Sequence, residues 1–133
     1  MLTQILTTQK ERDDLCQMLI DSSTDVAITK EDIAFLQEGN PVSVWQIEGA
    51  PSPQESRMDA LMREWKTKGN ACQDVKTIVL LFQTDQSNPL QMLEMQNIQE
   101  MCSLFSTNVE ALWGLGIDDN LGDSIRLTVV CGE

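Results

Sequence analysis

The sequence predicts an α+β domain: a two-layer sandwich in which a mixed four-stranded sheet carries helices on one face. The length of 133 residues is that of one domain, and the 41% apolar and 23% charged fractions are typical of a globular chain. Helix-type and strand-type apolar patterns follow one another in the order helix, helix, strand, helix, strand, helix, strand, strand. No internal repeat or linker interrupts this order, so we expect a single domain over residues 1–133.

The N-terminal part of the chain is expected to form two helices. In residues 1–22, apolar side chains at helical spacing stand on both sides of a polar stretch, which predicts one N-terminal helix. In residues 23–39, Thr29 is suited to an N-cap, an acid occupies the capping-box position three residues later, and Gly39 is a stop signal. We therefore predict a short helix from Lys30 to Glu38.

Residues 40–133 are expected to hold the core sheet and its covering helices. The segment "VSVWQIEG" alternates and ends in the turn-forming "GAPSP", which predicts a strand. A helix follows in "QESRMDALMREWKTKG" and stops at Gly69. The continuous apolar run "KTIVLLFQT" is typical of a central strand covered on both faces. The next helix is predicted to begin with Asn88 as N-cap and Pro89 at its first position.

The last two predicted strands, "VEALWGLGI" and "SIRLTVVCG", are joined across "DDNLGD" and are expected to form an antiparallel hairpin or to be sheet neighbours. The junction concentrates Asp118, Asp119 and Asp123, while Asn120 and Gly122 suit a turn with φ > 0. The acids lack the alternation and the final glutamate of a calcium loop, and an exposed turn does not separate the pKa values of two carboxyl groups. We interpret the segment as a solvent-exposed turn without metal or catalytic residues.

The composition argues against several function classes. No histidine is present, which excludes a histidine-based mechanism. The 21 acidic and 9 basic residues give a formal charge of −12, which would repel nucleic acid and anionic membranes. No glycine-rich phosphate-binding motif occurs, so no cofactor is expected. The four cysteines include no CxxC pair, and no signal-peptide pattern opens the chain, so we expect free thiols in a cytoplasmic protein.

The closing strands and their acidic turn carry a motif: a Trp-Gly pair, a turn with Leu-Gly-Asp, and a strand that begins Arg-Leu-Thr-Val. Its positions are Trp113, Gly114, Asp118, Leu121, Gly122, Asp123, Arg126, Leu127, Thr128 and Val129. This motif resembles the end of the C-terminal, or activation, domain of FtsZ, a cell-division GTPase of the tubulin family. The likeness continues upstream through "KTIVLLFQTDQSNPLQMLEMQNIQEMCSLF", "VSVWQIEGAPSPQESRMDALMREW" and "DVAITKEDIAFLQEG". It covers roughly residues 15 to 133.

The resemblance implies the fold of that domain but not the activity of the family. The family's Gly-Gly-Gly-Thr-Gly phosphate loop has no counterpart here, so we expect no binding of GTP. In the family, a synergy loop supplies an Asn and two Asp residues that orient the water attacking the γ-phosphate in a neighbouring subunit. The matching positions here are Ala27, Thr29 and Asp32, which retain only the second aspartate. We therefore expect that the chain is not an enzyme.

We interpret the chain as a non-enzymatic protein-interaction domain that modulates the assembly of FtsZ-type filaments or associates with itself. In the family, the synergy-loop end of the domain faces the next filament subunit, which makes that segment the candidate partner-binding surface. Its candidate residues are Ile28, Lys30, Glu31, Asp32 and Phe35. Packing of this segment's apolar residues on the sheet is an equally good interpretation. Two further alternatives are a small-molecule-binding or enzymatic α/β oligomer of the chorismate-mutase type, and one half of a split FtsZ-like protein.

Overall fold

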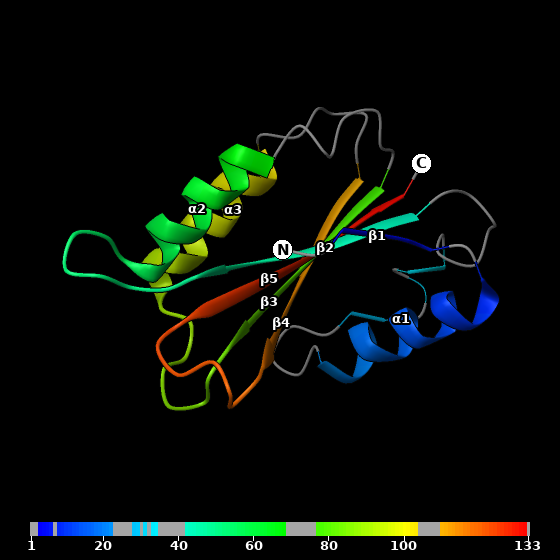
Figure 1. The fold of residues 1–133 in the computed structure, drawn as a ribbon, viewed down its shortest axis with the longest axis horizontal. Helices are drawn as coiled ribbons and strands as arrows, with labels where there is room; N and C mark the ends of the chain where they lie inside the picture. The colour runs from blue at the N-terminus through cyan, green and yellow to red at the C-terminus, as the bar shows by residue number, and fades with distance from the viewer. Residues whose placement is uncertain are drawn as a thin grey trace.

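The computed structural model describes residues 3–6, 8–22, 28–29, 31, 33–34, 42–68, 77–103 and 110–132. Within these residues the chain forms five strands and three helices (Figure 1). In chain order they are β1 (Thr3–Leu6), α1 (Gln9–Ser22), β2 (Val42–Gly49), α2 (Arg57–Lys68), β3 (Thr77–Thr84), α3 (Met92–Ser103), β4 (Glu110–Ile117) and β5 (Ile125–Gly132). The α+β class and the mixed sheet predicted from the sequence are confirmed, and β1 adds a fifth strand to the four that were predicted. None of the described helices is long and apolar enough to cross a membrane.

The strands lie side by side in the order β1-β2-β5-β3-β4. The middle strand, β5, runs antiparallel to both of its neighbours, β2 and β3, whereas β4 pairs with β3 in parallel. It follows that β2, β3 and β4 share one direction, so their carboxyl ends lie together. We call this end, with the turns 50–56, 85–91 and 118–124, the turn end of the sheet. Both α2 and α3 begin there, because each follows one of these strands (Figure 1).

The predicted pairing of the last two strands is wrong. β4 and β5 are separated by β3, so that Leu80 of β3 lies opposite Trp113 of β4 on one side and opposite Val129 of β5 on the other. A strand that is buried on both faces must pair both of its edges, because water cannot reach its peptide groups. The prediction that β3 is a central strand is confirmed. The aspartate turn crosses the end of β3, where Asp118 N–H donates to the Thr84 carbonyl oxygen (3.0 Å).

The predicted helix over residues 1–22 is wrong at its start. Residues Thr3–Leu6 form β1, which pairs antiparallel with β2 at the edge of the sheet. The helix α1 begins only after a capping box, in which Thr8 N–H donates to Glu11 Oε1 (3.1 Å) and Glu11 N–H donates to Thr8 Oγ1 (3.2 Å). The spacing of apolar residues over so short a segment does not distinguish a strand from a helical turn. The segment forms a strand because the edge of β2 offers hydrogen-bond partners for its backbone.

The predicted short helix from Lys30 to Glu38 lies largely outside the described residues. Its described part comprises Glu31, Ile33 and Ala34, where Ala34 N–H donates to the Glu31 carbonyl oxygen (3.4 Å) in a turn. Ile33 is buried against the sheet. The packing interpretation of this segment therefore holds for Ile33.

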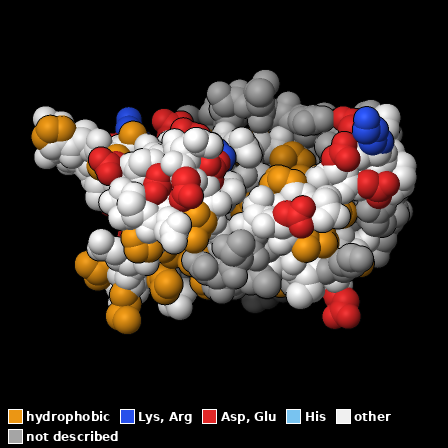
Figure 2. Space-filling view, turned by 90° about the horizontal axis from the view of Figure 1, so that it is seen from below, with side chains coloured by type: hydrophobic (Ala, Val, Ile, Leu, Met, Phe, Trp, Pro, Cys, Tyr) orange, Lys and Arg blue, Asp and Glu red, His pale blue; other side chains and the backbone are white. Residues whose placement is uncertain are grey.

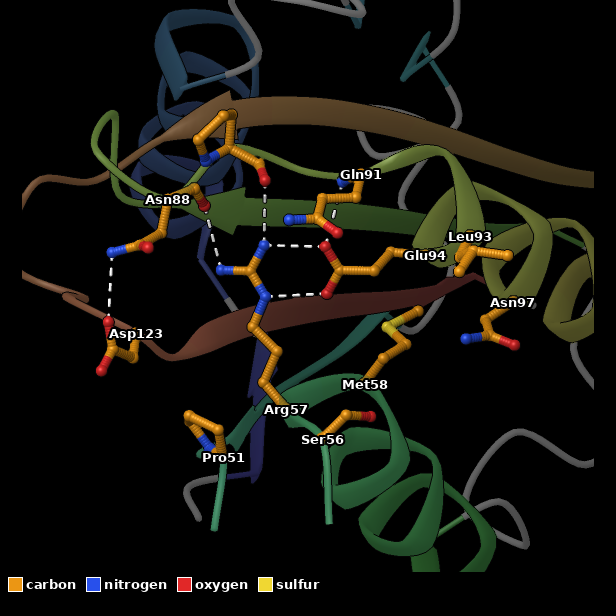
Figure 3. Close-up of a pocket in the computed structure, with 11 residues that line it drawn as sticks. Pro51, Ser56, Arg57, Met58, Asn88, Gln91, Leu93, Glu94, Asn97 and Asp123 are labelled. Carbon is orange, nitrogen blue, oxygen red and sulfur yellow. Dashed lines mark hydrogen bonds and ion pairs between the residues drawn. The ribbon is translucent and has the colours of Figure 1, made fainter. Parts of the chain in front are cut away.

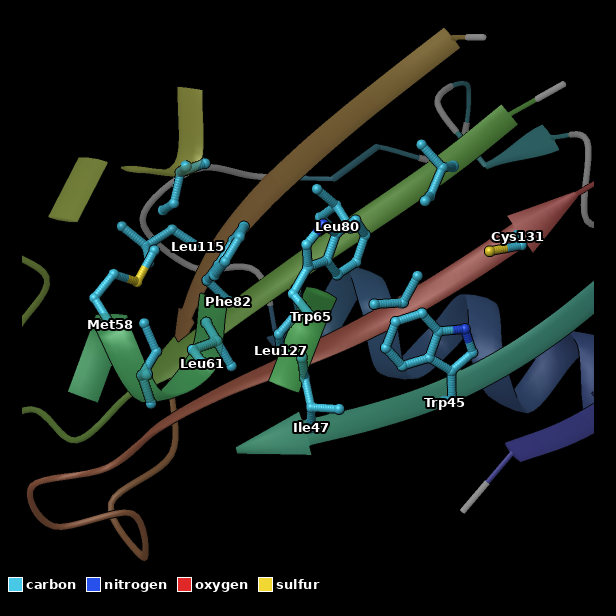
Figure 4. Packing of buried hydrophobic residues seen from close by; sticks show 14 residues of the cluster. Trp45, Ile47, Met58, Leu61, Trp65, Leu80, Phe82, Leu115, Leu127 and Cys131 are labelled. Carbon is cyan, nitrogen blue, oxygen red and sulfur yellow. The ribbon is translucent and has the colours of Figure 1, made fainter. Parts of the chain in front are cut away.

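Two hydrophobic clusters cover opposite faces of the sheet, which corrects the expected two-layer arrangement with helices on one face. Side chains of β3 alternate between them: Leu80 and Phe82 belong to the cluster with α2 (Figure 4), and Val79 and Leu81 belong to the cluster with α1. Leu19 of α1 is fully buried in the second cluster, which is worth about 1.5–3 kcal/mol for a leucine. Because β3 is apolar on both faces, both faces require a helical cover.

The helix α2 lies unusually close to β2. A Cβ atom at Gly49, the last residue of β2, would overlap the carbonyl oxygen of Arg57 and would lie 2.8 Å from the backbone nitrogen of Leu61. At the other end of the contact, Trp65 of α2 stacks on Trp45 of β2 with ring centroids 5.7 Å apart. Glycine at position 49 therefore permits the close approach that fixes where α2 begins.

Candidate functional site

A cleft of about 520 Å³ opens at the turn end of the sheet, between the starts of α2 and α3 (Figure 3). We call it the α2–α3 cleft. Its lining comes from all three turns and from both helices: Pro51, Ser56, Arg57, Met58, Asn88, Pro89, Gln91, Leu93, Glu94, Asn97 and Asp123. The carboxyl ends of parallel strands are where open α/β sheets place their binding residues, so the position of this cleft makes it the first candidate for a functional site.

Arg57 and Glu94 form a bidentate ion pair within the α2–α3 cleft. Arg57 Nε donates to Glu94 Oε2 (2.7 Å) and Nη2 donates to Oε1 (2.8 Å). The guanidinium also donates to the carbonyl oxygens of Asn88 (3.0 Å) and Pro89 (3.1 Å). Only 10% of the Arg57 side chain and 14% of the Glu94 side chain are exposed. We call this pair the Arg57–Glu94 clamp, because it ties the first residue of α2 to the first turn of α3.

Each of these helix starts is also capped by a side chain. Ser56 Oγ accepts a hydrogen bond from Asp59 N–H (3.1 Å) at the start of α2. Glu94 Oε1 accepts one from Gln91 N–H (3.0 Å), so the same carboxylate caps α3 and binds Arg57. The predicted N-cap role of Asn88 is wrong: α3 begins three residues further on, and the Asn88 side chain instead reaches the β4–β5 turn.

The clamp is held in its charged form. Burial alone would raise the pKa of Glu94, but the hydrogen bonds from Arg57 and from Gln91 N–H, together with the Arg57 charge, bring it below the ordinary value. The hydrogen bond to Glu94 raises the pKa of Arg57 against the opposing effect of burial. A carboxylate and a guanidinium so stabilised do not exchange protons near neutral pH. Arg57 and Glu94 therefore act as a structural contact that fixes the two helices relative to each other. Because their charges pair with each other, neither charge is available to bind a ligand.

The aspartate turn is a turn, as predicted, but it is not simply solvent-exposed. Asp118 Oδ2 accepts a 2.7 Å ion-pair hydrogen bond from Arg126, and the Asp118 side chain is only 22% exposed. Hydrogen bonding from Asn120 N–H, followed by Arg126, lowers the pKa of Asp118. Asp119 Oδ1 accepts from Gln86 N–H (3.2 Å) in the neighbouring turn. The acids thus bind separate partners, and the described residues contain no group of acids and cysteines arranged to hold a metal ion.

Two more carboxylates join the turns that surround the cleft. Asp123 Oδ1 accepts from Asn88 Nδ2 (3.2 Å), and Asp85 Oδ2 accepts from Gly122 N–H (3.1 Å). Gly122 has φ of 59°, the left-handed region that favours glycine and that the sequence predicted for this turn. Hydrogen bonds from Ser87 are the main reason that the pKa of Asp85 is lowered. The turns 85–91 and 118–124 are therefore fastened to each other by their polar side chains.

The candidate partner-binding residues taken from the synergy-loop segment are only partly placed. Ile28 is 3% exposed and packs with α1 and the sheet, so it belongs to the core and is not a surface anchor. Glu31 is exposed. Lys30, Asp32 and Phe35 lie outside the described residues, and their docking role stays a prediction.

Sequence reasoning missed the Arg57–Glu94 clamp. The two residues are 37 positions apart, and each looked like one charge among many at the start of a predicted helix. One signal in the sequence was available: Arg57 is a cation at the start of a predicted helix, where the helix dipole is unfavourable for a positive charge. Such a residue is expected to have a nearby acid as partner.

Comparisons with known proteins support the fold. No family model and no curated protein sequence match the chain. A solved structure of an FtsZ dimer from M. jannaschii matches with a TM-score of 0.61 and 16% identity, over 87% of this chain and 34% of that chain. A point mutant of FtsZ from the same organism matches with a TM-score of 0.64 and 14% identity, over 96% of this chain and 42% of that chain. The chain therefore spans less than half of the FtsZ chains that it matches, and its fold is that of an FtsZ C-terminal-like domain.

Proposed function

We propose that this chain is a non-enzymatic protein-interaction domain that binds FtsZ-type filament subunits, or itself, and thereby modulates filament assembly. The observation that carries the proposal is an FtsZ-like fold whose candidate site contains a structural ion pair. In the Arg57–Glu94 clamp the two charges pair with each other and connect α2 to α3. A domain of this kind presents a fixed surface to a partner without performing chemistry on it.

The chemistry of the α2–α3 cleft supports a non-enzymatic role. Glu94 is stabilised as a carboxylate, and Arg57 directs four hydrogen bonds to acceptors within the domain. General acid–base catalysis at neutral pH requires a group whose pKa lies near the working pH, and the chain contains no histidine to provide one. We also expect no GTP binding, and calorimetric titration of the protein with GTP and magnesium should give no heat of binding.

The comparisons support association between chains. One of the matching FtsZ structures is a dimer, so a protein with this fold is found associated with a copy of itself. In the sequence resemblance, the segment with Lys30, Glu31 and Asp32 is the end that faces a neighbouring subunit. We keep these charges as a proposed docking surface, in which Ile28 acts as buried support and not as a contact.

Co-sedimentation tests the proposal. Purified protein should pellet with FtsZ polymerised from the same host, in an amount that saturates as the protein concentration rises, and it should stay in the supernatant without FtsZ. The double variant Lys30→Glu/Asp32→Lys should pellet less in low salt at an unchanged melting temperature, because charges at a docking surface mainly change the rate of encounter. Pelleting of wild-type protein no greater than that of an unrelated acidic protein would contradict the role at FtsZ filaments.

A further inference from the structure

The exposed large apolar side chains of the described residues lie at the turn end of the sheet. Among the described residues, the exposed large hydrophobic side chains are Met92 (79% exposed), Leu93 (73%), Met95 and Ile117. The first three lie in the first turns of α3, and Ile117 is the last residue of β4, opposite Thr84 at the end of β3. All four therefore belong to the turn end of the sheet. We call them the apolar patch.

The members of the apolar patch lie on the same side of the sheet. Ile117 follows Leu115 by two residues in β4, and Leu115 packs in the cluster with α2 and with Ile98 of α3. Since residues two apart in a strand share a face, Ile117 lies on the α3 side. Leu93 lines the α2–α3 cleft, which connects the patch to the hollow at its border. Exposed large apolar side chains beside a cleft are typical of a protein-binding surface.

Three acids that form no ion pair with a described Lys or Arg lie at the same end of the sheet as the apolar patch. Asp123 lines the same cleft as Leu93, while Asp85 and Asp119 lie in the two turns that adjoin the ends of β3 and β4. No described Lys or Arg forms an ion pair with any of the three. The arginines of this region are already engaged, Arg57 by Glu94 and Arg126 by Glu48 and Asp118. We call these three aspartates the acidic rim.

Figure 2 shows the surface of the molecule from below the view of Figure 1. In its left half, which holds the turn end of the sheet, several acidic side chains lie beside a group of hydrophobic ones, and basic side chains are sparse. The turn end thus offers exposed apolar side chains next to carboxylates that form no ion pair with a described Lys or Arg.

The negative charge of the acidic rim determines which kind of partner can bind the apolar patch. A second copy that used the same patch would bring two acidic rims together across a two-fold axis, and the formal charge of −12 adds a general repulsion. A segment with Lys or Arg next to large apolar residues would cover the patch and neutralise the rim at the same time.

We infer that the apolar patch and the acidic rim form a docking site for a partner-protein segment that carries large apolar side chains beside Lys or Arg. The inference rests on the proposed function, because it gives a protein-interaction domain a second docking surface, besides the segment with Lys30, Glu31 and Asp32, and names the chemistry of its partner. The Arg57–Glu94 clamp serves this site by holding the start of α3, where three of the four apolar residues lie, in a fixed position against α2.

The probe is a fluorescent synthetic peptide with leucine at helical spacing and lysine at the flanking positions, and its control has every lysine replaced by glutamate. Binding to the whole protein is measured by fluorescence anisotropy in low salt. The leucine–lysine peptide should bind, and the leucine–glutamate peptide should bind at least about tenfold more weakly. The variant Leu93→Ser should lose about tenfold in affinity at an unchanged melting temperature, because the lost contact belongs to the complex and not to the core.

Matched variants separate the rim from the overall charge. Asp123→Asn should weaken peptide binding in low salt and have little effect in high salt, where exposed charges are screened. Asp14→Asn removes an exposed acid from α1, on the opposite face, and should leave binding unchanged. Equal effects of these two variants, or equal binding by Leu93→Ser and wild type, would overturn the inference.

The remaining outcomes are also decisive. Self-association of the protein that Leu93→Ser abolishes would assign the patch to a second copy and would contradict a basic partner. Pelleting of both wild type and Leu93→Ser with FtsZ, without peptide binding, would refute the inference and leave the proposed function standing. Peptide binding without pelleting would retain the docking site and refute the role at FtsZ filaments.

Discussion

Replacement of Arg57 by alanine should be among the most damaging single changes outside the hydrophobic clusters. The substitution removes four hydrogen bonds of 2.7–3.1 Å and leaves the Glu94 carboxylate, only 14% exposed, without its cation. Breaking a buried ion pair costs about 3–5 kcal/mol, whereas an exposed pair is worth about 0–1 kcal/mol. Because a small part of each side chain still reaches water, we expect a loss of about 2–4 kcal/mol.

The loss is measurable by thermal or urea unfolding, followed by the fluorescence of the three tryptophans. An unfolding entropy of about 2.1 cal/mol/K per residue converts each kcal/mol into about 3–4 °C for a chain of this length, so the melting temperature should fall by about 7–14 °C. The matched control is Arg63→Ala, which breaks an ion pair with Glu55 whose arginine is 65% exposed. That variant should lose less than about 1 kcal/mol.

A double variant tests the mechanism of this loss. In Arg57→Met/Glu94→Gln both charges are gone, while the glutamine oxygen can still cap α3 at Gln91. The double variant should be more stable than Arg57→Met alone by about 1 kcal/mol or more, since no uncompensated carboxylate remains. Additive losses in the double variant, or a loss for Arg57→Ala no larger than for Arg63→Ala, would refute the view of this pair as a clamp.

Three further predictions follow from the same contacts. Asp118→Asn should lower the melting temperature more than Asp119→Asn does, because Asp118 holds the ion pair with Arg126, and neither effect should depend on calcium; equal melting temperatures, or a calcium-dependent rise lost in the variants, would contradict this. The folded-state pKa of Glu94 is depressed, so its contribution is fully present above the ordinary value of 4.5 and is lost as the pH falls through the lower folded value; the stability of Glu94→Gln should change less over that acidic window, as urea midpoints at successive pH values would show. Gly49→Ala should cost about 1–3 kcal/mol, because its methyl group overlaps the backbone of α2, and wild-type stability would refute that close approach.

Patterns within short sequence segments predicted those elements whose conformation depends little on contacts with distant residues. The apolar run of β3, the helical spacing of Met58, Leu61 and Trp65 in α2, and the turn residues around Gly122 each determine their own conformation to a large extent. What they do not determine is which edges meet. Burial of β3 on both faces requires a strand at each of its edges, but it does not determine that these strands are β4 and β5.

The candidate site was less predictable for the same reason. The three aspartates of the turn lie within six residues of one another in the sequence, yet each binds a different partner. The Arg57–Glu94 clamp and the apolar patch arise only where the starts of two helices and the end of β4 meet. Exposed Met92 and Leu93 stand in the same helix as buried Ile98, and only the packed structure separates them.

The most direct test of a protein-interaction domain is sedimentation velocity of the fluorescently labelled protein, alone over a range of concentrations and with rising amounts of unpolymerised FtsZ from the same host. We predict a faster-sedimenting species whose fraction saturates with FtsZ and decreases when the Arg57→Ala variant loosens the start of α3. A single sedimentation coefficient, independent of FtsZ and of the protein's own concentration, would contradict the account.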